Sequence, residues 1–331
     1  MVKTFGKLAD GREVLLFAIE NGRVRAEVTD YGASLVSVLV DGVDVCLGCD
    51  DVRGYERNGA YLGAVVGRNA NRMSDAGFML NGQLVKLPAN EGKNNLHSGP
   101  DSWGWRMWKL VKHTENSLTL AIHSPDGDQG FTGNADVTVT YTIEDNGLTI
   151  RYRAVSDKDT AFNLTNHAYF NLFGQDKPER AMDQELMIPA EAFCPDDDAN
   201  IPTGELRSVE GTPFDFRSFK SIGRDIGMDY EPLHLQGGYD HNFVNNQAVC
   251  AVMRNPENGL TMTVTTDLPG VQLYAGNFLD NSGKGGVYYG KRSGVALETQ
   301  YFPDSVNHPE WDQPFVKAGE VMETVTRYAF E

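Results

Sequence analysis

The sequence predicts an all-β protein, a large antiparallel β-sandwich with very little helix. Three observations support this class. Asn-Gly and Asp-Gly pairs recur between β-rich runs, glycine makes up 35 of the 331 residues, and no long stretch has the residue spacing of an amphipathic helix. Many short strands joined by tight turns are typical of sandwiches and barrels.

Six turn pairs mark the expected hairpins. Asparagine or aspartate followed by glycine supplies the positive φ angles that a tight hairpin turn requires. The clearest case has alternating apolar and polar residues at 137–143 and 148–154, on either side of Asn146-Gly147. The pairs are Asp10-Gly11, Asn21-Gly22, Asp41-Gly42, Asn81-Gly82, Asn146-Gly147 and Asn258-Gly259.

Two segments differ from this strand-and-turn pattern. Residues 216–226 have spacing that predicts one short helix. Residues 194–209 form the longest polar stretch, with Pro195, Pro202 and three consecutive aspartates, and we expect an ordered excursion there. No linker interrupts the chain, so we expect a single domain over residues 1–331.

Composition restricts the class of ligand. The formal net charge is −17 and the isoelectric point is near 4.8. Nucleic acids and anionic membrane surfaces attract basic patches, so neither is an expected partner. We expect a small neutral ligand or one that carries its own cation. The sequence leaves open whether the chain is a monomer or a homodimer.

The N-terminal segment and the cysteines indicate a cytoplasmic protein. The first residues have no apolar core of a signal peptide, and the longest apolar runs, such as 14–19, are far too short to cross a bilayer. Four cysteines are too few for a disulfide framework and are expected to be free thiols. The glycosylation sequon at Asn163 is therefore expected to be unused. Cys46 and Cys49 form one C-x-x-C, but no second pair supports a metal or redox site, and no metal is predicted.

Three strand-like segments carry polar residues on one face. In residues 163–172 the odd positions are all polar, and the even ones are mostly apolar. The segments 270–279 and 294–302 alternate in the same way. The polar sets are Asn163, Thr165, His167, Tyr169 and Asn171, then Gln272 and Tyr274, then Glu298 and Gln300. A sheet face lined by these groups suits a neutral polyhydroxylated ligand such as a sugar.

Three loops contribute further candidates. Residues 67–72 supply Arg68 and Arg72, residues 94–99 supply His97, and residues 237–243 supply Asp240 and His241. Each residue alone is more often structural or solvated than functional. The sequence has no H-E-x-x-H zinc motif, no G-x-S-x-G nucleophile elbow and no phosphate-binding loop.

Taken together, the segments resemble the aldose 1-epimerase family, the galactose mutarotases. The matching pieces occur in the family's order and cover most of the chain. Two features depart from the family's pattern: Ser98, where Leu-His-Gly-Gly is usual, and the tryptophan-rich stretch 101–108. The pieces are Y-L-G-A-V-V-G-R-N-A-N-R at 61–72, N-L-H-S-G at 95–99, N-L-T-N-H-A-Y-F-N-L at 163–172, G-Y-D-H-N-F at 238–243, G-V-Q-L-Y-A-G-N-F-L at 270–279 and L-E-T-Q-Y-F-P-D at 297–304.

The resemblance implies a galactose mutarotase-like supersandwich that interconverts the α and β anomers of free hexoses without a cofactor. It implies that Glu298 is the general base and His167 the general acid. The implied sugar-binding residues are Arg72, His97, Asp240 and Gln272, with Asn71 and Tyr169 nearby.

Ring opening fits these residue types. It removes the proton of the C1 hydroxyl and delivers one to the ring oxygen, so one base and one acid must flank the same carbon. From reference pKa values, we expect a carboxylate and an imidazole to perform this task without extreme shifts.

The sequence leaves three alternative functions open. Asp240 and Glu298 could be the carboxylate pair of a glycoside hydrolase, although the histidine in the strongest motif weighs against it. The chain could be a sugar-binding module without activity. Arg68 and Arg72 could hold the phosphate of a hexose phosphate, against which the acidic composition weighs.

Overall fold

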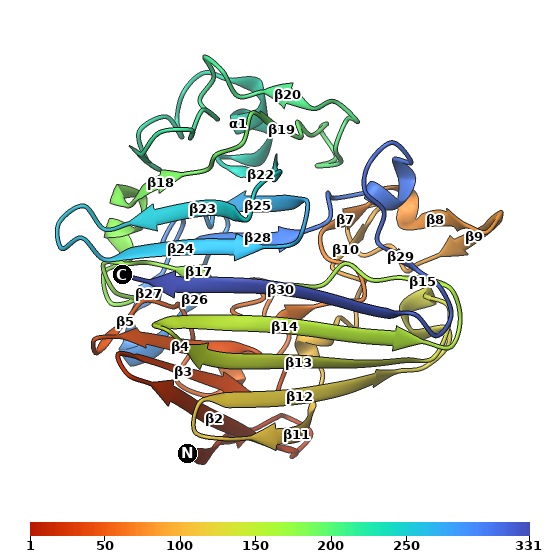
Figure 1. Ribbon diagram of the computed structural model, residues 1–331, viewed down its shortest axis with the longest axis horizontal. Helices are drawn as coiled ribbons and strands as arrows, with labels where there is room; N and C mark the ends of the chain where they lie inside the picture. The colour runs from red at the N-terminus through yellow and green to blue at the C-terminus, as the bar shows by residue number, and fades with distance from the viewer.

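The computed structural model describes residues 1–331 as an antiparallel β-sandwich, which confirms the predicted fold class. Every pairing between its named strands is antiparallel. The largest sheet has nine strands, and its long central strands run side by side across Figure 1. In sheet order these are β11 (Lys109–His113), β12 (Ser117–Ser124), β13 (Ala135–Glu144), β14 (Gly147–Ser156), β30 (Val321–Phe330), β24 (Thr261–Thr266), β23 (Val249–Arg254), β18 (Glu185–Met187) and β21 (Lys220–Ser221).

Two smaller sheets complete the sandwich. The six-stranded sheet consists of β17 (Tyr169–Phe170), β28 (Val295–Gln300), β25 (Gly270–Tyr274), β22 (Asp240–Val244), β19 (Ala192–Phe193) and β20 (Arg207–Ser208). The five-stranded sheet consists of β1 (Val2–Lys7), β2 (Glu13–Asn21), β3 (Val24–Thr29), β4 (Leu35–Val40) and β5 (Val43–Asp44).

The remaining strands form five short pairs. They are β7 (Arg72–Met73) with β10 (Asn95–Leu96), β6 (Val65–Val66) with β16 (Thr165–Asn166), β8 (Gly77–Leu80) with β9 (Gln83–Lys86), β15 (Thr160–Ala161) with β29 (Phe315–Val316), and β26 (Asn281–Ser282) with β27 (Tyr288–Tyr289). The 3₁₀ turns are η1 (Val52–Gly54), η2 (Ser74–Ala76), η3 (Trp103–Trp105), η4 (Asp128–Gly130), η5 (Pro178–Asp183), η6 (Lys284–Gly286) and η7 (Ser305–Asn307).

One main core of 57 buried residues joins the three large sheets. β13 supplies Val137 and Val139, the five-stranded sheet supplies Phe17, and the six-stranded sheet supplies Leu273 and Leu297. Along β13 buried residues alternate with more exposed ones, as the sequence pattern predicts for a strand with one face in a core. The alternate residues of the six-stranded sheet therefore point to its other face.

All six predicted turn pairs mark connections between antiparallel partners. At two of them the turn is displaced by one residue, because Asn21 is the last residue of β2 and Gly147 the first residue of β14. At the clearest one, Glu144 pairs with Gly147, and the two turn residues Asp145 and Asn146 have φ angles of 46° and 57°. Positive φ at both central residues is the requirement of the tightest hairpin turn. Local turn chemistry therefore predicts these connections correctly.

The predicted helix at residues 216–226 is wrong. The segment contains turns and the short strand β21, because its backbone bonds to a neighbouring segment: Ile222 N–H donates to Gln184 O and Gly223 N–H to Met182 O. The only α-helix is α1 (Glu231–Gln236), near the top of Figure 1. Pro232 lies in its first turn, and Gly237 ends it with a φ of 66°.

Other expectations concern single residues. All four cysteines are unpaired, as predicted, and all four are buried. Asn163 is 1 % exposed and its amide bonds the backbone of Tyr301, so the sequon is enclosed in the fold.

The polar stretch at residues 194–209 is ordered, as expected, by backbone hydrogen bonds such as Thr203 N–H to Pro195 O. No helix of the chain has both the length and the apolar character needed to span a membrane.

Candidate active site

The six-stranded sheet brings distant segments of the chain onto one face. Gln272 on β25 lies directly opposite Glu298 on β28, and on its other side opposite Asn242 on β22. The next row, two residues along, pairs Asp240 with Tyr274. Side chains two apart on a strand share a face, so these five residues point to the same side of the sheet.

His167, from the 163–172 segment, lies next to Glu298 in the same row. Tyr169 on β17 pairs with Ala296 on β28, and continuing that antiparallel register places His167 opposite Glu298. His167 Nε2 is 3.6 Å from Glu298 Oε1. Both side chains are buried, with exposed fractions of 7 % and 3 %. The structure thus brings together the two residues to which the resemblance gives the acid and base roles.

A pocket of about 390 Å³ opens over this pair. Five of the six other expected site residues line this pocket: Asn71, Arg72, His97, Tyr169 and Asp240. Gln272 is not among the lining residues. Its Nε2 instead donates a 2.7 Å hydrogen bond to Asp240 Oδ1, so in this structure Gln272 orients the carboxylate that faces the pocket.

Arg72 is fixed in the pocket wall by a carboxylate. Its Nε lies 2.6 Å from Glu91 Oε2, and its Nη2 lies 3.0 Å from Glu91 Oε1. Burial alone lowers the pKa of Arg72, but the hydrogen bonds to Glu91 and the negative charges of Asp240 and Glu91 outweigh this effect, and the net pKa lies above its ordinary value. The guanidinium therefore stays charged and holds a defined direction.

His97 enters the pocket as a neutral hydrogen-bond donor. The backbone N–H of Asn71 donates to His97 Nδ1 at 3.1 Å, so we assign the ring proton to Nε2. Burial first, and then the charges of His167 and Arg72, lower the pKa of His97 well below its ordinary value. A neutral imidazole with a fixed tautomer is suited to donate to a sugar hydroxyl.

Tyr169 and Asp240 complete the expected set. The hydroxyl of Tyr169 donates to Ala60 O at 2.9 Å, which holds its ring 5.0 Å from the ring of His167. Burial raises the pKa of Asp240, and the positive charge of Arg72 and the hydrogen bond from Gln272 oppose this rise. The pocket therefore contains the carboxyl group of Asp240, which is influenced by the positive charge of Arg72.

Burial changes the acid–base properties of the central pair. It raises the pKa of Glu298 well above its ordinary value, with a further rise from the charge of Asp240, and it lowers the pKa of His167 to about 4. The expectation that the pair works near its reference pKa values is therefore wrong. Enclosure therefore favours the uncharged form of each side chain, a protonated carboxyl and a neutral imidazole.

The sequence analysis did not find several other lining residues, among them Tyr61, Glu91 and Phe278. Tyr274, which the sequence places on the polar strand face with Gln272, also lines the pocket, because residues two apart on a strand share a face. Glu91 had no signal in the sequence, because its importance depends on the pairing of β7 with β10, which brings two loops together. Phe278 is 73 % exposed at the mouth of the pocket.

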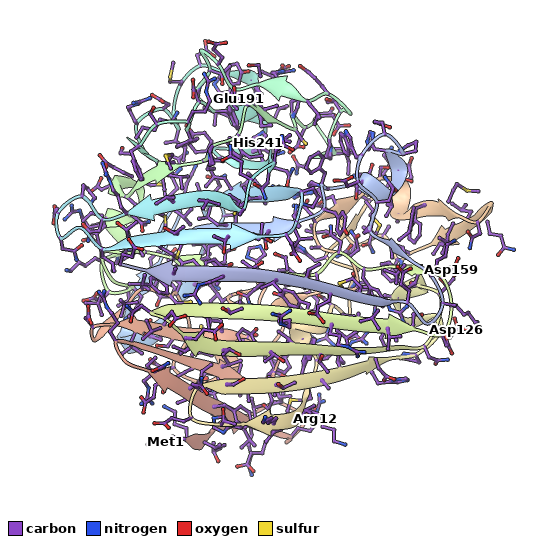
Figure 2. The ribbon with its side chains drawn as sticks, in the orientation of Figure 1. Met1, Arg12, Asp126, Asp159, Glu191 and His241 are labelled. Atoms are coloured by element: carbon purple, nitrogen blue, oxygen red, sulfur yellow. The ribbon has the colours of Figure 1, made fainter.

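Two candidates from the loops lie outside the site. Arg68 is buried, and its guanidinium bonds Ser124 Oγ, Thr132 O and Gly133 O, so it supports the fold. His241, labelled in Figure 2, lies on the opposite face of β22, with its ring 4.7 Å from that of Phe214. The alternation of side chains along the strand separates His241 from Asp240.

The His, Asp and Glu side chains of the pocket do not form a group of three that converge on one point, the arrangement that a metal site requires. The pocket is lined instead by the close pair of His167 and Glu298, an arginine fixed by Glu91 and a neutral His97. In a β-sandwich, a buried acid–base pair beside groups that can bind hydroxyls suits an enzyme that moves protons on a sugar.

Comparison with known proteins gives the family. A model of the aldose 1-epimerase family matches residues 16–329, and the chain belongs to this family. It is 41 % identical to an aldose 1-epimerase of Haemophilus influenzae over 91 % of both chains. It is 38 % identical to a galactose mutarotase of Bos taurus over 98 % of this chain and 97 % of that protein.

Solved structures agree with this assignment. A GalM/aldose epimerase homologue from C. elegans has a TM-score of 0.88 and 30 % identity, covering 96 % of this chain and 98 % of its own. A galactose 1-epimerase from Lactobacillus acidophilus has the same TM-score at 28 % identity, covering 100 % of this chain and 98 % of its own. The predicted family and fold are therefore confirmed.

Proposed function

We propose that this protein is an aldose 1-epimerase that interconverts the α and β anomers of free hexoses such as galactose and glucose. The observation that carries the proposal is the 3.6 Å separation of His167 Nε2 and Glu298 Oε1 in the wall of a polar pocket. The anomeric hydroxyl and the ring oxygen are bound to the same carbon, so a base and an acid this close together can serve both atoms at once.

In the proposed reaction Glu298 removes the proton of the C1 hydroxyl while His167 gives a proton to the ring oxygen. The bond between C1 and the ring oxygen breaks, and the open aldehyde forms. Rotation about the bond between C1 and C2 then presents the other face of the carbonyl. Ring closure runs both proton transfers in reverse, so the pair ends as it began, without a net proton gain.

Substrate binding supplies the charge states that this assignment needs. Burial favours a protonated Glu298 and a neutral His167. A sugar hydroxyl that donates to Glu298 stabilises its carboxylate, and a ring oxygen that accepts from His167 stabilises its imidazolium. The carboxyl proton of Glu298 therefore moves to His167 as the sugar binds, in the direction that ring opening requires.

The remaining pocket residues hold the sugar in this proposal. Arg72, His97 and Asp240 bind its hydroxyls, with Asn71 and Tyr169 beside them, while Gln272 orients Asp240. The charges favour a neutral sugar over a sugar phosphate, because four acidic side chains (Glu91, Asp240, Asp280 and Glu298) line the pocket against one arginine that is already paired with Glu91. Arg68, the second cation that a phosphate would need, is enclosed elsewhere.

Polarimetry on freshly dissolved α-galactose tests the proposal. We expect the wild-type chain to accelerate the approach to anomeric equilibrium for galactose and glucose, and to act poorly on their 6-phosphates. Glu298→Gln and His167→Asn should each reduce kcat about 10²- to 10⁴-fold, because each removes one proton-transfer group. Near-normal turnover by either variant would contradict the assigned roles, and release of chromophore from an aryl galactoside would favour hydrolysis.

The proposal includes a cytoplasmic site of action. Four unpaired, buried cysteines support it, because thiols persist in reducing compartments. Burial raises the pKa of the Cys46 thiol to about 12, so this thiol stays in its unreactive protonated form. Fractionation of the native host cell with a reporter fusion would check the location.

A further inference from the structure

Ser98 occupies a turn whose backbone suits glycine. His97, Ser98 and Gly99 have successive φ angles of 51°, 67° and 103°. Glycine adopts positive φ readily, whereas a serine there is strained by its Cβ atom. Ser98 is also fully enclosed, at 0 % exposed. A strained and buried serine indicates that its hydroxyl has a role that offsets the backbone cost.

The hydroxyl of Ser98 joins the turn to a second pocket segment. It accepts a 2.8 Å hydrogen bond from the backbone N–H of Asn69 and donates a 2.9 Å bond to the carbonyl of the same residue. Both hydrogen-bonding groups of Asn69's backbone are therefore engaged by one side chain. The position of the 97–99 turn relative to residues 69–72 is fixed at this point.

The same two segments meet again at the pocket. His97 N–H donates to Asn71 O, and Asn71 N–H donates to His97 Nδ1, both at 3.1 Å. The second of these bonds sets which ring nitrogen of His97 carries the proton that faces the pocket. The Asn71–His97 bond forms only when the two segments are aligned. The Ser98–Asn69 bonds hold that alignment, because Ser98 directly follows His97 and Asn69 lies two residues before Asn71.

We propose that Ser98 is a positioning residue for His97: by holding residues 69–72 against the turn, its hydroxyl keeps the His97 ring in the orientation and tautomer that bind the sugar. The inference rests on the proposed function for its kinetic consequence. Ser98 itself does not line the pocket, so it acts through His97 and does not touch the substrate.

Ser98→Gly is the decisive variant, because it removes the hydroxyl and relieves the strained backbone at the same time. We expect KM for galactose to rise about three- to tenfold, the value of one weakened neutral hydrogen bond, with kcat within twofold of wild type. Ser102→Ala is the matched control. Ser102 is an equally buried serine four residues on, whose hydroxyl has no protein partner, so its KM should be unchanged.

A double-mutant cycle shows whether Ser98 acts through His97. The effect of Ser98→Gly on KM should disappear in a His97→Asn background, because the ring that it positions is then absent. An unchanged KM in Ser98→Gly, or the same KM increase in both backgrounds, overturns the proposal. If Ser98→Gly does not fold, Ser98→Cys, which is similar in size but a weak hydrogen-bonding group, is used in the same cycle.

A spectroscopic measurement separates this inference from the proposed function. The ring ¹⁵N signals of His97 report which nitrogen carries the proton, whatever reaction the pocket performs. We expect a single tautomer protonated at Nε2 in the wild type and in Ser102→Ala, and a mixture in Ser98→Gly. A single Nε2 tautomer in Ser98→Gly contradicts the positioning role even if the protein is an active mutarotase. Absence of mutarotation by the wild type contradicts only the proposed function.

Discussion

Arg72 and Glu91 form an ion pair with two hydrogen bonds in the wall of the pocket, at 2.6 and 3.0 Å. The side chain of Arg72 is 12 % exposed and that of Glu91 is 34 % exposed, so solvent screens the pair only in part. The geometry matches the planar fork of a guanidinium with a carboxylate. The pair fixes the direction in which the one cation of the pocket presents its remaining N–H groups.

Arg72→Lys should therefore weaken sugar binding although it keeps the charge. A lysine cannot hold Glu91 through two parallel bonds and also donate in a fixed direction to the sugar. We expect KM for galactose to rise about tenfold or more, which corresponds to the loss of one charge-assisted hydrogen bond. Lys93→Gln is the control, because Lys93 forms only an exposed pair with Asp75 and should leave KM unchanged.

Glu298→Gln should raise stability while it removes activity. The pKa of Glu298 is raised in the folded protein, mainly by burial. The folded state then binds a proton more tightly than the unfolded state, so ionisation destabilises the fold as pH rises above the ordinary glutamate value near 4.5. A glutamine cannot ionise and avoids this loss.

The measurement is the melting temperature of both proteins as a function of pH. We expect Glu298→Gln to melt above the wild type at pH 8, and the difference to shrink toward zero near pH 4, where both side chains are uncharged. A variant that is less stable than the wild type at pH 8 would show that the carboxylate form is favoured in the folded pocket, against the direction stated for its pKa.

Buried histidines should make the fold sensitive to acid. Burial, with a smaller contribution from Arg207, lowers the pKa of His241 to about 3. Between that value and about 6.5 the unfolded chain binds a proton that the folded chain does not, so stability rises with pH across this window and is lost as pH falls. The upper bound of this effect for one histidine is about 5 kcal/mol.

His241→Phe should flatten this dependence. The histidine ring already packs against Phe193 and Phe214, so a phenylalanine suits the site. Chemical denaturation at pH 4.5 and pH 7 gives the free energy of unfolding, and the difference between the two values should be smaller in the variant. His123→Gln, at an exposed position, should show the wild-type difference. Equal pH dependence in all three proteins would contradict the stated pKa of His241.

The sequence predicted those features that depend on local chemistry. The hairpin predicted at Asn146-Gly147 is present, with its two turn residues one position earlier at Asp145 and Asn146, whose side chains tolerate positive φ. The common face of Gln272 and Tyr274 follows from strand alternation alone. Position in the family's motifs supplied the partnership of His167 with Glu298, which the register of β17 against β28 then explains.

The features that failed or were missed depend on contacts between distant segments. The segment around Ile222 has helical spacing, but its backbone bonds to Gln184 and Met182 override that preference. Glu91 is identified as a pocket residue only by its ion pair with Arg72, which the sequence does not indicate. The shifted pKa of Glu298 arises from burial, which reference values do not include.

Tyr61 joins the two histidines of the pocket to an aromatic stack. The ring of Tyr61 lies 4.7 Å from that of His97 and 6.1 Å from that of His167. Tyr61 also stacks on Trp105, with 5.0 Å between centroids and 21° between planes. Trp105 belongs to the tryptophan-rich stretch that departs from the family's pattern, and it does not line the pocket.

Trp105→Leu should therefore impair catalysis through Tyr61. Loss of the stacked ring removes about 0.5–1.5 kcal/mol of aromatic pairing and leaves Tyr61 free to tilt away from both histidines. We expect kcat/KM for galactose to fall about three- to tenfold, together with a lower melting temperature. Trp311→Leu is the matched control, because Trp311 stacks on His308 outside the pocket. Trp311→Leu should lower the melting temperature similarly and leave kcat/KM unchanged. Equal losses of activity in both variants would show that Trp105 contributes only to the stability of the fold.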